Sequence, residues 1–287
     1  MSTAEAQIAA VPEVVIAPPS RWSGIQLGEL WAHRELIYFL TKRELQVRYK
    51  QSVFGVSWAV LQPLAFAFIF AAIFGTLVNL PTQHIPFAVY AIVGLVPWLF
   101  TAGAIGNGAT SLVQDANLIS KVYFPRLALP ISKALSLIVD LVIGVPVVLL
   151  MIAIYGVGIE ATAPLAILFL ALGVITAFGL GTLFAAVNVK YRDVGLIVPV
   201  FIQLMFFATP ILWSVVDANG NHIRDGIQYI LAINPMFSAI EGVRWAVIGT
   251  NFPGWPEIAI SAASSLVILF VALRYFQSAE QSFADNI

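Results

Sequence analysis

Ionisable side chains are the natural place to look for chemistry, and this chain carries few of them. Of its 287 residues only 10% are charged and 60% are hydrophobic, whereas soluble domains carry about 25% charged residues. Asp140 is the one acid well inside a long apolar segment. A carboxylate inside a membrane is costly and marks a candidate functional site. Three interpretations stay open: an ion pair with Lys133, two helical turns earlier, a place on a transport pathway, or proton coupling.

Motifs for catalysis or for binding a cofactor are missing from the sequence. Gly173, Gly179 and Gly181 are not followed by a lysine, so they form no phosphate-binding loop; we expect them to let helices approach closely. The absence of cysteine excludes disulfides and thiolate metal sites, and the three scattered histidines indicate no metal site. The net charge of −1 argues against a nucleic-acid partner. We therefore expect a non-catalytic chain without its own cofactor or metal.

The stretch "NLISKVYFPRLALP" (117–130) combines cations and aromatic rings between two long apolar segments. Tyr123 and Phe124 could anchor in a groove of a partner protein, while Lys121 and Arg126 could pair with acidic groups there. The sequence therefore predicts a docking loop. The alternative is a solvated basic turn that only sets the membrane topology.

Six apolar segments are long enough to cross a bilayer, which needs roughly 20 apolar residues. We expect spans at about 54–78, 87–112, 130–155, 163–187, 195–214 and 257–275. These spans place residues 26–287 in one all-α membrane domain, preceded by a flexible tail over 1–25.

Between the last two spans, residues 226–240 are apolar but too short to cross the bilayer. Asn234-Pro235 interrupts this segment, which predicts short re-entrant helices that close the external end of the pathway. Glu241 and Arg244 lie three residues apart in the same region and can form an ion pair on one helix face.

Residues 29–50 predict an amphipathic helix along the inner leaflet, although Arg34, Glu44 and Arg48 interrupt its apolar face. A soluble helix packed on a partner is the alternative. Most of the 14 lysines and arginines fall on the side of the chain termini, and only Arg224 and Arg244 fall on the other. Because basic residues favour the cytoplasmic side, we expect both termini to be cytoplasmic.

Aromatic residues make up 12% of the chain and are frequent in the predicted spans. Phe66, Phe70 and Phe74 repeat every four residues and share one helix face, with Phe68 opposite. Rings in spans usually face lipid or pack between helices. The sharper hypothesis is a conduit in which sugar rings stack on aromatic faces. The candidate channel-lining residues are Phe66, Phe70, Phe74, Trp98, Phe206 and Phe207.

Several segments resemble the permease subunits of type-2 ABC exporters, which export O-antigen, capsule or teichoic-acid polymers. The resemblance runs in family order from about residue 34 to 245. It is carried by "RELQVRYKQSVFGVSWAVLQPL" (43–64), "GLVPWLF" (94–100), "NLISKVYFPRLALP" (117–130), "NVKYRDV" (188–194), "ATPILW" (208–213) and "INPMFSAIEGVRW" (233–245).

The resemblance implies a homodimer in the bacterial cytoplasmic membrane that moves a lipid-linked polysaccharide. Two copies of a separate P-loop ATPase, which binds ATP and Mg, would dock beneath it. The implied ATPase-coupling residues are Lys121, Tyr123, Phe124 and Arg126, with Arg192 of the second cytoplasmic loop. An ABC exporter of a smaller lipid or drug stays open. A carrier driven by ions or protons would instead show internal repeats and more intramembrane charges.

Overall fold

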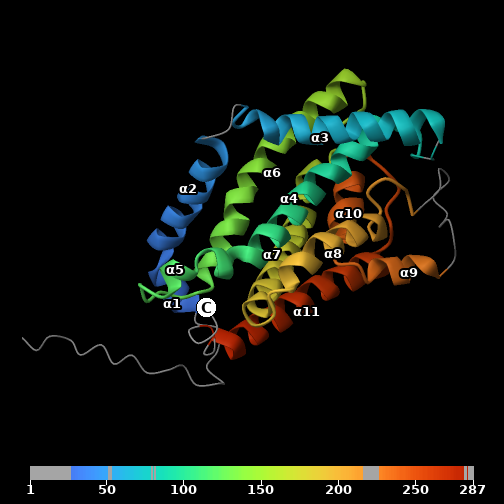
Figure 1. Cartoon of the computed structure of the whole chain (residues 1–287). Helices are drawn as coiled ribbons and strands as arrows, with labels where there is room; N and C mark the ends of the chain where they lie inside the picture. The colour runs from blue at the N-terminus through green and yellow to red at the C-terminus, as the bar shows by residue number, and fades with distance from the viewer. Residues whose placement is uncertain are drawn as a thin grey trace, which may run out of the picture.

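The structure is a computed structural model that describes residues 27–50, 54–78, 80, 82–215, 226–280 and 283, and all regular elements in these ranges are helices (Figure 1). The all-α prediction is therefore confirmed for the described part of the chain. The predicted tail over 1–25 lies outside the described residues.

Five helical segments are long and apolar enough to cross a membrane, so the protein is a multi-pass integral membrane protein. They correspond to five of the six predicted spans, and their ends lie within about five residues of the predicted ends. The segments are α3 (Ser57–Phe70) continued by the π-helix η1 (Ala71–Leu77), α4 (Phe87–Gln114), α6 (Ala128–Ile154), η2 (Ala163–Leu165) with α7 (Ala166–Lys190), and α11 (Trp255–Glu280).

The fifth predicted span is shorter than expected. Helix α8 runs from Val194 to Ala208, and Thr209 is extended with φ −99° and ψ 139°. The prediction of a span over 195–214 is therefore wrong beyond Ala208. The physical reason is Pro210, which disfavours the helical conformation of the residue before it and has no backbone N–H to donate.

Helix α4 forms the centre of the bundle. In its most apolar window 83% of residues are buried, compared with 11% for the α3 segment. Close packing against α7 depends on small residues, because a Cβ added to Gly108 would lie 3.0 Å from the Cα atom of Gly181. The expectation that Gly181 serves helix packing is confirmed.

The predicted helix over 29–50 is present as α1 (Leu27–Ala32) and α2 (Arg34–Lys50), separated by a turn at His33. Figure 1 shows α1 at one end of the bundle, beside α5 (Ala116–Ile119) and the end of α11, and α2 leading away from it along the side of the bundle. Helix α2 packs along α6. This end of the molecule therefore gathers the predicted docking loop, the N-terminal helices and the last turn of α11.

The expected break at Asn234-Pro235 is confirmed. It separates α9 (Ile227–Ala232) from α10 (Phe237–Ile248). Helix α10 has 12 residues, is almost wholly buried and packs on α7 and α4. Its short length and deep burial fit a helix that enters the bundle and leaves again, as the sequence predicts.

Candidate functional site

The predicted docking loop between α5 and α6 has one exposed face. The Tyr123 side chain is 69% exposed, and Lys121 and Val122 are exposed beside it. Arg192, in the loop that follows α7, is exposed as well. Three of the five predicted coupling residues, Lys121, Tyr123 and Arg192, are thus accessible to a partner.

Phe124 is not accessible, and the expectation that its ring anchors in a partner's groove is wrong. Its side chain is 5% exposed and belongs to a buried cluster that includes Leu112, Leu129, Phe276 and Phe283. The ring therefore fixes the loop to the permease itself. This role is hard to predict from sequence, because an aromatic ring suits a core and a docking site equally well.

Arg126 is also turned toward its own chain. One guanidinium nitrogen donates to the backbone carbonyl of Glu280 at the end of α11, and the Arg126 backbone N–H donates to the Glu280 carboxylate over 3.4 Å. The guanidinium carbon lies 5.9 Å from the Phe283 ring centroid. Arg126 thus ties the docking loop to the C-terminal helix, which sequence reasoning missed because 154 residues separate the two partners.

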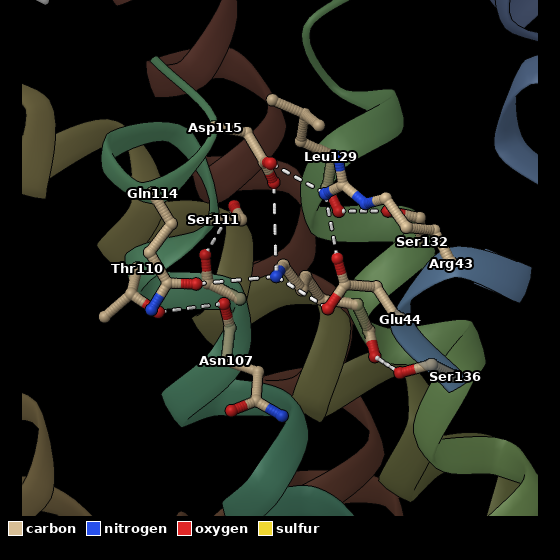
Figure 2. A network of polar contacts seen from close by, with 12 residues as sticks. Arg43, Glu44, Asn107, Thr110, Ser111, Gln114, Asp115, Leu129, Ser132 and Ser136 are labelled. Atoms are coloured by element: carbon tan, nitrogen blue, oxygen red, sulfur yellow. Dashed lines mark hydrogen bonds and ion pairs between the residues drawn. The ribbon is translucent and has the colours of Figure 1, made fainter. Parts of the chain in front are cut away.

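A network of four charged side chains joins α2 to the same loop. Figure 2 shows Arg43 of α2 turned toward Asp115, which links α4 to α5, and toward the neighbouring Glu44. Arg43 Nη2 lies 2.9 Å from Glu44 Oε1 and 2.6 Å from Asp115 Oδ1. Lys133 of α6 donates to Glu44 Oε2 over 2.8 Å and to Gln114 over 3.4 Å. The network is neutral overall and connects three helices.

The partner predicted for Asp140 is wrong. Asp140 accepts a hydrogen bond of 2.8 Å from Arg48 Nη1 and another from the Tyr49 hydroxyl, both at the end of α2. Seven residues correspond to about 10.5 Å along a helix, so Lys133 reaches Glu44 instead. The charges that interrupt the apolar face of α2, Glu44 and Arg48, are the ones that bind α6.

The environment of Glu44 favours its charged form. Burial by itself raises the pKa of this carboxyl, but the hydrogen bonds from Lys133 and Arg43 outweigh burial, so the pKa lies below its ordinary value. Glu44 therefore remains a carboxylate at neutral pH, and both cations keep their partner.

All six predicted channel-lining residues join one aromatic cluster. Ring centroids lie 5.9 Å apart for Phe66 and Phe70, 6.0 Å for Phe70 and Phe74, and 5.9 Å for Phe70 and Phe206 of α8. Phe206 continues the cluster to Trp98 at 5.7 Å and to Phe207 at 5.3 Å.

All of these rings except Phe74 border a groove of about 390 Å³ between α3, α4 and α8, to which Gln203 adds an amide. Phe68 does not border the groove, and its side chain is 75% exposed. As predicted, Phe66 and Phe70 share one face of α3, and Phe68 lies on another. A groove with several aromatic faces and one amide has the chemistry to hold sugar rings.

Arg244 lies beside the start of α4, at the end of the bundle away from the docking loop, and is fully buried. The predicted pair with Glu241 is confirmed at 2.8 Å. Arg244 also donates to the backbone carbonyls of Pro210 and Ile211, and its guanidinium carbon lies 3.7 Å from the Tyr90 ring centroid. The carbonyls freed where α8 ends are thus satisfied by a side chain of α10.

The Asn234-Pro235 break contacts the end of α8 as well. The Asn234 amide donates to Thr209 Oγ1 over 2.8 Å and to the Ala208 carbonyl over 3.3 Å. The Pro235 carbonyl accepts hydrogen bonds from Ser265 over 3.1 Å and from Ser261 over 3.2 Å. The two breaks in helical structure therefore satisfy each other's polar groups, as an apolar surrounding requires.

Comparison with known proteins places this arrangement in a family. The family described as ABC-2 type transporter matches residues 35–248. The chain belongs to this family. The match covers the docking loop, the aromatic groove, the Arg244 centre and all of α2 but its first residue, whereas the contacts that α11 makes with the loop and with Pro235 lie beyond it.

Individual relatives match over nearly their whole length. The O-antigen export system permease protein RfbA of Myxococcus xanthus is 29% identical over 90% of this chain and 98% of its own. RfbA of Klebsiella pneumoniae is 29% identical over 88% and 94%, respectively. The polysialic acid transport protein KpsM of Escherichia coli is 26% identical over 84% and 92%.

Proposed function

We propose that this chain is the membrane-spanning permease of an ATP-driven exporter that moves a lipid-linked polysaccharide across the bacterial cytoplasmic membrane. The observation that carries the proposal is the aromatic groove, in which rings from α3, α4 and α8 line one surface. Membership of a transporter family and relatives named for O-antigen and polysialic acid export support it. Both termini then lie in the cytoplasm.

Stacking gives the groove its transport chemistry. The faces of sugar rings carry C–H groups that pack against aromatic rings, and each contact is worth about 1 kcal/mol by analogy with other aromatic pairs. Such contacts have little directional preference, so a polymer slides from ring to ring without a deep energy minimum. The Gln203 amide adds a hydrogen-bonding group for sugar hydroxyls.

The working exporter then needs a second copy of this chain. In a single copy the α3 segment buries little of its surface, and Phe68, Ile69 and Leu77 are exposed. The groove beside α3 is also open to one side. A second copy would close the groove and cover part of this apolar surface, while membrane lipid would cover the rest.

Energy would come from two copies of a separate P-loop ATPase that binds ATP and Mg. We assign the contact with this subunit to Lys121 and Tyr123 of the docking loop, with Arg192 beside them. Phe124 and Arg126 hold the loop in place from inside. The charge network of Arg43, Glu44, Asp115 and Lys133 would then pass a movement of the loop to α2 and α6.

Proton coupling is disfavoured by the surroundings of Asp140. Both of its oxygen atoms accept hydrogen bonds, from Arg48 and from Tyr49. With both oxygens held by side chains of α2, the carboxyl is committed to a contact between helices rather than left open toward a pathway. The pair ties α2 to α6, so the role we assign to Asp140 is structural.

A complementation experiment tests the proposed function. Deleting the gene should cause polysaccharide to accumulate inside the cell, and the wild-type chain should restore export. The double variant Phe66→Ala/Phe70→Ala should slow export several-fold at unchanged protein level, because it removes two neighbouring stacking contacts. Phe68→Ala is the matched control and should export normally. Normal polysaccharide export by the deletion strain would overturn the proposal.

A further inference from the structure

A second groove, separate from the aromatic one, lies between α3, α4, α6 and the end of α2. It has a volume of about 330 Å³ and shares only Leu99 with the aromatic groove. Most of its wall is apolar and includes Val96, Leu137 and Gly144. Neither the ATPase contact nor the proposed polysaccharide path uses it.

One end of this groove presents a positive and a negative group side by side. The Arg48 and Asp140 side chains are 27% and 25% exposed and lie 2.8 Å apart. Among the described residues only one Arg48 nitrogen has a hydrogen-bond partner, although a guanidinium carries five N–H donors. Several donors therefore remain open at the mouth of the groove.

A further polar group lines the same wall. Asn107 of α4 borders the groove, and Figure 2 shows its amide pointing away from the charge network. No hydrogen bond of this amide to another described residue is present. A membrane protein rarely leaves an amide without a partner, so a ligand with polar atoms suits this position.

We propose that the groove binds a phospholipid of the cytoplasmic leaflet whose headgroup is zwitterionic and carries a primary ammonium group, as phosphoethanolamine does. The phosphate accepts hydrogen bonds from the free Arg48 donors, and the ammonium group donates to the Asp140 carboxylate. One acyl chain lies along Val96, Leu99 and Leu137. The site sits where the end of α2 meets the middle of α6.

Charge complementarity selects this headgroup over the other common ones. An anionic glycerol headgroup pairs with Arg48 but brings no cation to Asp140. A choline headgroup carries a cation but no N–H donor, so it forms no hydrogen bond with the carboxylate. The order of retention should therefore be ethanolamine, then choline, then glycerol.

The test uses the full-length chain in nanodiscs made of equal parts phosphatidylethanolamine and phosphatidylglycerol. Native mass spectrometry after release into detergent should find ethanolamine lipid retained about tenfold over glycerol lipid, as one charge-assisted hydrogen bond predicts. Replacing ethanolamine lipid by phosphatidylcholine should reduce retention several-fold. This arm uses the wild-type chain and so does not depend on the folding of any variant.

Variants then locate the site. Arg48→Gln should lower lipid retention about tenfold, and Asp140→Asn should remove the preference for ethanolamine over choline. Lys121→Gln, a cation outside the groove, is the matched control and should retain lipid as the wild type does. Equal retention of all headgroups by the wild type would overturn the proposal. Trp58 of α3 also borders the groove. A disulfide between two copies of a Trp58→Cys variant would show a second copy in the groove and would overturn the proposal as well.

Discussion

Two charge clusters stand at opposite ends of the helix bundle, and they are built differently. At the docking end, Arg43, Glu44 and Lys133 come from α2 and α6 and share several partners; Arg43 and Glu44 are partly exposed and Lys133 is buried. At the other end, Arg244 and Glu241 come from one helix, are fully buried, and Arg244 also binds backbone carbonyls. Side chains on separate helices can exchange partners when the helices move, whereas a guanidinium bound to backbone holds one geometry.

The difference assigns a mobile role to one end and a fixed role to the other. A hinge or sliding contact needs two arrangements of similar energy, and a neutral network with spare acceptors offers them. A buried ion pair offers only one, because separating it leaves a desolvated charge. We therefore expect ATPase-driven movement to enter at α2 and the docking loop, while the Arg244 centre stays rigid.

The largest effect should come from breaking the rigid centre. Arg244→Met removes the only described partner of the Glu241 carboxylate and of two carbonyls, and should reduce the free energy of unfolding by about 3–5 kcal/mol. Thermal unfolding in detergent, followed by tryptophan fluorescence, measures this loss. Arg244→Lys should recover only part of the lost stability, because an ammonium group cannot reach all the acceptors of the guanidinium. A stable Arg244→Met variant would show that this end is not the fixed one.

The docking loop offers the next contrast, between two adjacent rings. Phe124→Ala empties a buried site and should destabilise the chain by about 3 kcal/mol or more. Tyr123→Ala removes an exposed ring and should leave stability unchanged. The amount of ATPase that co-purifies with the tagged chain, measured by its ATP hydrolysis, should fall several-fold. The opposite result, a stable Phe124→Ala variant without co-purifying ATPase, would restore Phe124 as the docking anchor.

Much of this architecture could be predicted because its signals are local. The row of Phe66, Phe70 and Phe74 and the pair of Glu241 and Arg244 follow from helical spacing, and the break at Asn234-Pro235 follows from the backbone chemistry of proline. Pro210 was an equally local signal for the end of α8, but the apolar character of the segment outweighed it in the prediction. The helical fold and the positions of the spans could be predicted because they too depend on local patterns of apolar residues.

The remaining contacts could not be predicted because they join distant parts of the chain. Arg48 and Asp140 are 92 residues apart, and Arg126 and Glu280 are 154 apart. Sequence spacing carries no information about such pairs, so a nearer candidate, Lys133, was chosen for Asp140. The packing of α2 along α6 decides the true partner, and that packing depends on the whole bundle.

The mobile network should show a smaller effect on stability and a larger one on coupling. Lys133→Met leaves Arg43 to neutralise two acids and should cost about 1–3 kcal/mol, less than the loss of Arg244, because the network is partly solvated. A double-mutant cycle with Glu44→Gln isolates the pair energy. Polysaccharide export should fall while ATP hydrolysis continues. Parallel loss of both activities, in proportion to protein level, would argue for a merely structural network.

The smallest effect concerns pH, and its sign follows from Glu44. Because the pKa of Glu44 in the folded chain lies below its ordinary value of 4.5, its contribution to docking α2 is complete above about pH 4.5 and is lost only as pH falls through the lower, folded value.

The chain has no cysteine, so spin labels at Tyr38→Cys on α2 and Val142→Cys on α6, both exposed positions, report the distance between these helices. That distance should stay constant from pH 7 to pH 5 and lengthen in more acidic solution. In a Glu44→Gln background the same measurement should show no such transition below pH 4.5. A distance that changes between pH 7 and pH 5 would instead point to a titrating group other than Glu44 and would contradict the assignment of this network as the contact that holds α2.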